Sequence, residues 1–232
     1  MAPPMTEAAG APDSTGGGSR EPLRALLIDW GGVLTTDLFQ SFHAYCVRAG
    51  IDPRKLLGRF KEDEYARELL VALETGKLDE HEFERLFAAL LEVPAEGLID
   101  GLFSGVHPDE PMVDAVRRAR AGGIRTALVS NSWGVHRYPR KMFAELFDGV
   151  VISGEEGMRK PSRRMYELGA ERAGAPARAC VFVDDLPFNL TPAREMGMAT
   201  IHHTDTNATI DELERLFELA LRDGAGPASP RA

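Results

Sequence analysis

The architecture of this chain is best worked out from one segment, Leu26-Leu27-Ile28-Asp29-Trp30-Gly31-Gly32-Val33-Leu34. Three apolar residues are followed directly by a carboxylate, and two glycines come soon after. This pattern is typical of a buried strand that ends in a tight loop, where α/β enzymes carry a nucleophile or a metal ligand. Asp29 is therefore the first candidate for a catalytic residue.

Strand and helix patterns alternate through most of the chain, which predicts an α/β fold with a doubly wound parallel sheet covered by helices on both faces. The predicted strands are Arg24–Asp29, Ile124–Ser130, Val150–Ser153, Cys180–Asp184 and Ala199–His202. The predicted helices are Glu110–Arg120, 137–147, 161–173, Phe188–Met196 and Ile210–Leu221. Gly122 and Gly123 end the first of these helices, and Pro161 is expected to be an early residue of the third.

One region breaks this alternation, because residues 37–103 show helical patterns and no convincing strand. Asp79 is placed to cap a helix whose apolar stripe contains Phe83 and Phe87. We interpret this block as a helical cap inserted into a core formed by residues 21–36 and 104–223; the alternative is a set of additional core helices. The segments 1–20 and 224–232 are rich in Gly, Pro, Ala and Ser and are expected to be disordered tails.

The composition of the chain limits its possible binding partners and its cellular compartment. The net charge of -9 argues against general binding to nucleic acid, although a metal and a lysine can still attract a small anionic substrate. No apolar run is long enough to span a membrane, and the N-terminus lacks a signal pattern. The two cysteines, Cys46 and Cys180, lie in apolar surroundings and are expected to be reduced. These features favour a cytoplasmic protein.

Residues with suitable chemistry lie at the ends of four predicted strands. Asp29 follows the first strand, Ser130 and Asn131 follow the second, Lys160 comes after the third, and Asp184 and Asp185 end the fourth. Parallel strands end at one edge of a sheet, where ligands bind. A carboxylate can attack phosphorus, paired carboxylates can hold Mg²⁺, and a lysine can offset the negative charge of a phosphate.

Four motifs carry a resemblance to the haloacid dehalogenase-like superfamily, and within it to the N-terminal phosphatase domain of soluble epoxide hydrolases. They are Asp29-Trp30-Gly31-Gly32-Val33-Leu34, Leu128-Val129-Ser130-Asn131-Ser132-Trp133, Gly157-Met158-Arg159-Lys160-Pro161, and Val181-Phe182-Val183-Asp184-Asp185 with Asn189. The resemblance implies a Rossmann-like core with an inserted cap and a small phosphorylated metabolite as the substrate. It implies Mg²⁺ as the cofactor.

The resemblance also assigns roles to individual residues. Asp29 would be the nucleophile and a metal ligand, and Lys160 would balance charge at the reaction centre and bind substrate. Ser130 and Asn131 would hold the phosphoryl oxygens. The backbone carbonyl of Gly31 and the carboxylates of Asp184 and Asp185 would complete the metal site.

Gly31 departs from the family pattern, in which an aspartate two residues after the nucleophile acts as the general acid and base. Such a group typically contributes ~10²–10⁴-fold to the rate. Water or a residue of the insertion, such as Asp37 or Glu64, could replace it, and the sequence singles out none of them. Two alternatives to a phosphatase follow: a 2-haloacid dehalogenase, which needs neither that acid nor magnesium, and a catalytically weak binding or regulatory protein.

Overall fold

The computed structural model describes residues 22–222, so the two predicted tails, 1–20 and 224–232, lie outside the described residues. The strands are β1 (Ala25–Ile28), β2 (Arg125–Ser130), β3 (Gly149–Ile152), β4 (Cys180–Asp184) and β5 (Ala199–His202). They form one parallel sheet in the order β3-β2-β1-β4-β5. The predicted α/β fold is confirmed, and each strand lies within one residue of its predicted bounds.

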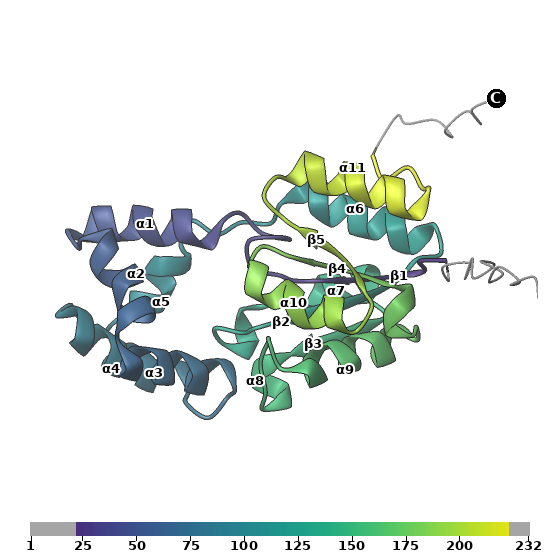
Figure 1. Cartoon of the computed structure of the whole chain (residues 1–232). Coiled ribbons are helices and arrows are strands. Elements are labelled where there is room, and N and C mark those ends of the chain that lie inside the picture. Colours follow the sequence, from purple (N-terminus) through teal and green to yellow (C-terminus); the bar gives the residue numbers. More distant parts are fainter. Residues whose placement is uncertain (1–21, 223–232) are drawn as a thin grey trace, which may run out of the picture.

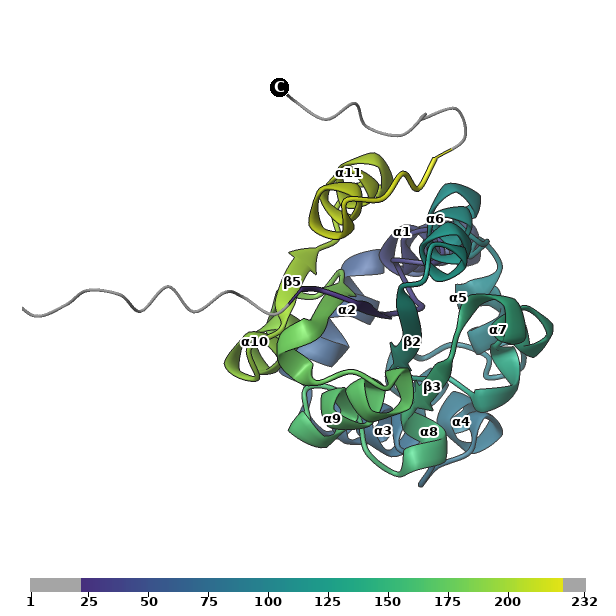
Figure 2. The ribbon, with the colours of Figure 1, turned by 90° about the vertical axis from the view of Figure 1, so that its right-hand side faces the viewer.

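The helices between these strands cover both faces of the sheet (Figures 1 and 2). On one face α6 (Glu110–Ala121), α7 (Arg140–Leu146) and α11 (Thr206–Phe217) pack on Leu26 and Ile28 of β1. On the other face α9 (Arg163–Ala173) and α10 (Pro187–Glu195) pack on Ala25 and Leu27. Because side chains alternate along a strand, both sets of apolar residues in β1 are buried and its carboxyl end is fixed in the middle of the sheet.

Five helices occupy the segment that was predicted to be an insertion. They are α1 (Leu38–Ala49), α2 (Pro53–Glu62), α3 (Glu64–Glu74), α4 (Glu80–Leu91) and α5 (Leu98–Phe103), and they enclose an apolar cluster of their own. Asp79 caps α4 as predicted, since its side chain accepts a hydrogen bond from the amide of Glu82 at 2.9 Å. We call α1–α5 the helical unit; Figure 1 shows it beside the edge at which β1 and its neighbours end.

The chain enters and leaves the helical unit through two paired segments. Thr35 and Pro108 form an isolated antiparallel bridge, and the amide of Thr36 donates to the carbonyl of His107 at 2.8 Å. The amide of Asp109 donates to the carbonyl of Leu34 at 3.0 Å. The helical unit is therefore joined to the α/β core through backbone groups of residues 34–36, in the segment that follows Asp29.

Three helix predictions differ from the structure. The predicted helix 137–147 is divided into η1 (Val135–Arg137) and α7, because Pro139 has no amide donor and holds Tyr138 in an extended conformation (ψ 137°). Pro161 precedes α9 rather than starting it, since Ser162 is the extended N-cap residue (ψ 125°). The last helix begins four residues early, at Thr206, because Asp205 caps it through the amide of Ala208 at 2.9 Å.

Short elements complete the chain: α8 (Ser153–Glu156) follows β3, and η2 (Ala177–Ala179) precedes β4. Within residues 22–222, no helix has both the length and the apolar character needed to cross a membrane.

Candidate active site

Three of the predicted site residues meet because β1 lies between β2 and β4. Asp29 directly follows β1, and its amide donates to the carbonyl of Val183 at 3.0 Å. Ser130 is the last residue of β2, and Asp184 is the last residue of β4. The register of parallel strands therefore brings side chains from distant parts of the sequence to one edge of the sheet.

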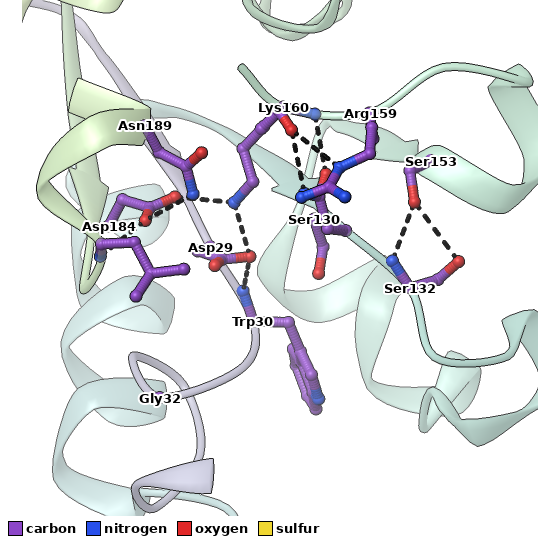
Figure 3. A network of polar contacts seen from close by, with 12 residues as sticks. Asp29, Trp30, Gly32, Ser130, Ser132, Ser153, Arg159, Lys160, Asp184 and Asn189 are labelled. Carbon is purple, nitrogen blue, oxygen red and sulfur yellow. Dashed lines mark hydrogen bonds and ion pairs between the residues drawn. The ribbon is translucent and has the colours of Figure 1, made fainter. Parts of the chain in front are cut away.

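Lys160 lies between two carboxylates (Figure 3). Its Nζ is 2.9 Å from Asp29 Oδ1 and 2.7 Å from Asp184 Oδ2, and the lysine is fully buried. Burial lowers the pKa of Lys160, but the charges of Asp184 and Asp29 overcome this effect and hold the pKa above its usual value. The ammonium group therefore stays charged inside the protein and binds both carboxylates.

Asp184 is held by the turn into α10. Its Oδ1 accepts hydrogen bonds from the amide of Leu186 and from Asn189 Nδ2, both at 2.9 Å. Tyr166 donates to the backbone carbonyl of Asn189 at 2.7 Å, which ties α9 to the same turn. With Oδ2 on Lys160, both carboxylate oxygens of Asp184 have fixed directions.

Asp29, Asp184 and Asp185 form a group of three carboxylates. One oxygen from each lies within 4.8 Å of the others. Burial raises the pKa of Asp29 to about 6, and burial together with the charges of Asp29 and Asp184 raises that of Asp185 to about 7. Oxygen donors at this spacing fit Mg²⁺, which holds oxygen ligands about 3–4 Å from one another in an octahedron. The residues present are therefore compatible with the predicted ion.

The two residues predicted to bind the phosphoryl group, Ser130 and Asn131, differ in their hydrogen-bond partners. Ser130 is buried, and its Oγ accepts a hydrogen bond from the hydroxyl of Tyr138 at 2.9 Å, which leaves its own proton to donate. The side chain of Asn131 is instead paired with the backbone of Lys160: Oδ1 accepts from its amide at 2.8 Å and Nδ2 donates to its carbonyl at 3.2 Å. Asn131 therefore positions Lys160, because its side-chain amide has one acceptor and one donor that pair with the backbone amide and carbonyl of Lys160.

Gly31 lies in the loop after Asp29 and, like Asp29, lines a cavity that opens toward the helical unit. A Cβ atom at this position would lie 2.8 Å from Leu38 Cδ1, so the leucine side chain fills the space of a side chain at position 31. Gly32 has a φ of +72°, and a Cβ there would lie 2.7 Å from Asp185 Oδ2. The second glycine is therefore required by backbone conformation and by the close approach of Asp185.

A cavity of about 350 Å³ opens from Asp29 toward the helical unit. Its polar lining includes Asp29, Lys160 and Asp185. The remaining wall is mostly apolar and contains Leu38, Phe39, Phe42, Leu57, Phe60, Leu70, Trp133, Leu186 and Phe188. A site of this kind suits a ligand with one charged end and one apolar end.

One residue at this cavity, Glu74, was not found from the sequence, and Arg159 was part of a motif but was given no role. Glu74, the last residue of α3, lines it and is 5% exposed, and Arg159 Nε lies 2.8 Å from Glu74 Oε2. The residues suggested from the sequence are elsewhere: Asp37 caps α1 by accepting from the amide of Phe39 at 2.7 Å, and Glu64 is exposed at the start of α3. No sequence pattern marks Glu74, because its position depends on how α3 packs on the core.

The remaining side chains of interest are Trp133, His203 and the two cysteines. Trp133 packs among Phe42, Phe60, Phe83 and Phe103 while it also lines the cavity, so it has both a packing and a lining position. His203 is buried, and its Nδ1 lies 2.9 Å from Thr209 Oγ1. Cys46 and Cys180 are free and buried, as predicted.

The sequence also matches the model of a protein family, the haloacid dehalogenase-like hydrolases, over residues 23–197. This match covers most of the chain and includes Asp29, Ser130, Lys160 and Asp184. The chain belongs to the haloacid dehalogenase-like hydrolases. This haloacid dehalogenase-like (HAD-like) chain is therefore an enzyme of the hydrolase class, and the resemblance inferred from its motifs is confirmed.

Curated relatives of this HAD-like hydrolase include both phosphatases and dehalogenases. It is 33% identical over 115 residues to bifunctional epoxide hydrolase 2 of Rattus norvegicus, covering 47% of this chain and 21% of the relative. It is 35% identical over 115 residues to the sesquiterpene phosphatase astK of Aspergillus oryzae (48% of this chain, 58% of the relative). It is 26% identical over 170 residues to the (S)-2-haloacid dehalogenase of Pseudomonas putida (69% and 68%). The chain thus spans less than two thirds of the first two relatives.

Solved structures agree with the fold of this HAD-like hydrolase. A HAD family enzyme of Bacteroides thetaiotaomicron in a magnesium complex has a TM-score of 0.59 at 21% identity, covering 79% of this chain and 94% of that one. A dehalogenase with an intermediate complex has a TM-score of 0.60 at 18% identity, covering 84% and 97%. At these identities the likeness concerns the fold.

Proposed function

We propose that this protein is a Mg²⁺-dependent phosphatase that hydrolyses a small phosphate monoester through an aspartyl-phosphate on Asp29. The observation that carries the proposal is the buried Lys160 ammonium between Asp29 and Asp184, beside the third carboxylate of Asp185. The three carboxylates provide the oxygen ligands for a divalent ion, and that ion together with Lys160 would supply the positive charge that a dianionic phosphoryl group needs.

In this mechanism Asp29 attacks the phosphorus atom, and Lys160 offsets the charge that gathers there. The Ser130 hydroxyl donates to a phosphoryl oxygen while Tyr138 holds it in place. Asn131 fixes the backbone of Lys160 and thereby the direction of its side chain. Asp29, the carbonyl of Gly31, Asp184 and Asp185 would hold Mg²⁺, which supplies charge neutralisation and polarises the phosphoryl oxygens when bound.

The cavity supports a substrate whose alcohol part is apolar. Its walls are formed by aromatic and aliphatic side chains, and Phe39 and Phe188 remain partly exposed. A relative that is 35% identical over 115 residues is named a sesquiterpene phosphatase, which fits an apolar alcohol. We therefore place the substrate among phosphate monoesters of small hydrophobic alcohols.

A second candidate is hydrolysis of a 2-haloacid, in which Asp29 attacks carbon. It is favoured by Gly31, since no acid is needed for a halide leaving group, and by the 26% identity to the Pseudomonas putida enzyme over 69% of this chain. The group of three carboxylates argues for the phosphatase, because displacement of a halide gains nothing from two further acidic groups, Asp184 and Asp185, beside the nucleophile.

The proposal is tested with a panel of alkyl and aryl phosphates, assayed with Mg²⁺ and with chelator, together with chloride release from a 2-haloacid. The phosphatase should turn over the esters only with Mg²⁺, and Asp29→Asn should abolish turnover because the nucleophile is lost. Chloride release without phosphate release would identify the dehalogenase. Binding of phosphate without turnover of any ester would identify a binding protein.

A further inference from the structure

The phosphatase reaction proposed above leaves one group unassigned, the donor of a proton to the leaving oxygen. Gly31 has no side chain, and Leu38 fills the space where one would lie. An alkoxide leaves poorly from phosphorus unless it is protonated, whereas a nitrophenolate leaves without a proton. A phosphatase of alkyl esters with this sequence therefore needs an acid from another part of the chain.

The cavity at Asp29 contains few groups that could be this acid. Within residues 22–222, its other ionisable side chains are Lys61, Glu74, Arg159, Lys160 and Asp185. Lys160 is bound to two carboxylates, and Asp185 belongs to the group of three. Lys61 is exposed, and a guanidinium such as that of Arg159 keeps its proton at all ordinary pH values. Among the groups that line this cavity, Glu74 is the carboxyl group that remains.

Glu74 is held against the core rather than carried on a free helix end. The hydroxyl of Ser153 donates to its backbone carbonyl, and Arg159 Nε lies 2.8 Å from its Oε2. Ser153 Oγ in turn accepts from the amide of Ser132, in the loop after β2. These contacts fix the carboxyl group of the helical unit relative to the loops that carry Asn131 and Lys160 (Figure 3 shows Ser132, Ser153 and Arg159).

We propose that Glu74 is the general acid and base of this phosphatase and takes the place of the missing aspartate at position 31. In the first step Asp29 forms its bond to phosphorus, the bond from phosphorus to the leaving oxygen breaks, and that oxygen takes the proton of Glu74. In the second step the Glu74 carboxylate takes a proton from water, the hydroxide attacks phosphorus, and the bond to Asp29 breaks. Alcohol and phosphate leave, and both carboxyl groups return to their starting state.

The surroundings of Glu74 suit this role. Burial raises its pKa to about 7, although Arg159 and then Lys160 act in the opposite direction, and Asp29 adds a further increase. A carboxyl group with a raised pKa is protonated below that value and ionised above it. The acid form is therefore lost as the pH rises through about 7, and the rate with alkyl esters should fall on that side.

The test compares wild type with Glu74→Gln on an alkyl phosphate and on p-nitrophenyl phosphate, with Mg²⁺. We expect the variant to lose ~10²–10⁴-fold in kcat for the alkyl ester. With p-nitrophenyl phosphate, formation of the aspartyl-phosphate needs no acid. Hydrolysis of the aspartyl-phosphate in the variant, however, lacks its base. The variant should therefore release a burst of about one nitrophenolate per active site, followed by slow turnover. The fall in alkyl turnover near pH 7 should disappear.

Glu80→Gln is the matched control. Glu80 also joins the helical unit to the core, through Arg137 at 2.7 Å, but it does not line this cavity. It should leave the ratio of alkyl to aryl rates unchanged and give no burst. A Glu74→Gln enzyme with wild-type rates on both esters overturns the role of Glu74 and leaves the proposed function intact. Wild-type protein without Mg²⁺-dependent turnover overturns the proposed function and this role with it.

Arg159→Gln provides a second test that keeps the carboxyl group and serves if Glu74→Gln fails to fold. Because Arg159 holds down the pKa of Glu74, its removal should move the fall in alkyl turnover to higher pH. An unmoved pH profile contradicts the assignment.

Discussion

At the scale of the residue, this site is a set of buried charges that depend on one another. Burying an ammonium group is costly unless opposite charges accompany it, and Lys160 has Asp29 and Asp184 within 2.9 Å. The same burial raises the pKa of the Asp29, Glu74 and Asp185 carboxyls. The pKa of each of these residues therefore depends on the charges of the others. Substitutions in this site are best interpreted through double-mutant cycles.

Gly31→Asp should rescue the Glu74→Gln variant. The new carboxyl group lies two residues after Asp29, at a position that lines the same cavity as Glu74, and can donate a proton there. Gly31 does not have a positive φ, and the close atom is the mobile end of Leu38, so the loop can accept the side chain. We expect at least about a tenfold rise in kcat for the alkyl phosphate. In wild type the gain should be small, because Glu74 already supplies the acid.

Gly31→Asn is the control for that rescue, since it has the same shape and no acidic proton. An equal rise with Gly31→Asn would mean that space rather than proton transfer limits the reaction. A large rise with Gly31→Asp in wild type would mean that no other acid is acting.

At the scale of the element, the end of α3 is the part that determines the geometry of the site. Gly76, two residues beyond Glu74, has a φ of +69°, and a Cβ there would lie 2.5 Å from the carbonyl oxygen of Gly154 in α8. Glycine at this position allows the backbone after α3 to lie directly against α8. The close contact brings a residue of the helical unit to a site built on the strands.

Gly76→Ala should therefore affect catalysis as well as stability. Gly50→Ala is the matched control, because Gly50 has a φ of +70° and nothing within 4 Å of its added Cβ. Gly50→Ala should lower the free energy of unfolding by about 1–2 kcal/mol through backbone strain alone. Gly76→Ala should cost more and should also lower alkyl phosphate turnover. Urea unfolding and steady-state kinetics measure both effects; equal losses for the two variants would contradict the close contact.

At the scale of the whole molecule, the site joins two parts of the protein. Asp29, Ser130 and Asp184 come from strand ends of the α/β core, whereas Glu74 and much of the apolar cavity wall come from the helical unit. Arg137 joins the parts through Glu80 at 2.7 Å and Asp100 at 2.9 Å. Binding of a ligand at this site is therefore linked to the stability of the folded chain.

Mg²⁺ should raise the thermal midpoint of unfolding, because the three carboxylates come together only in the folded protein. At 100 times the dissociation constant the gain is about 2.7 kcal/mol, or several degrees. Asp184→Asn should remove the dependence on Mg²⁺ even if it changes the midpoint itself. Thermal scans at constant ionic strength measure this, and a midpoint that rises equally in both proteins would show that the ion binds elsewhere.

The sequence alone determined the α/β fold, the succession of strands and helices along the chain, and the residues at the strand ends. These features are local or periodic: apolar runs predict strands, Asp79 predicts a helix start, and parallel strands bring their carboxyl ends to one edge. The tertiary structure alone decided that Glu74 lies at the cavity, that Leu38 fills the space beside Gly31, and that Asn131 pairs with the backbone of Lys160. Those contacts join residues far apart in the chain, and they depend on how α3 and the loops pack, which no local pattern in the sequence encodes.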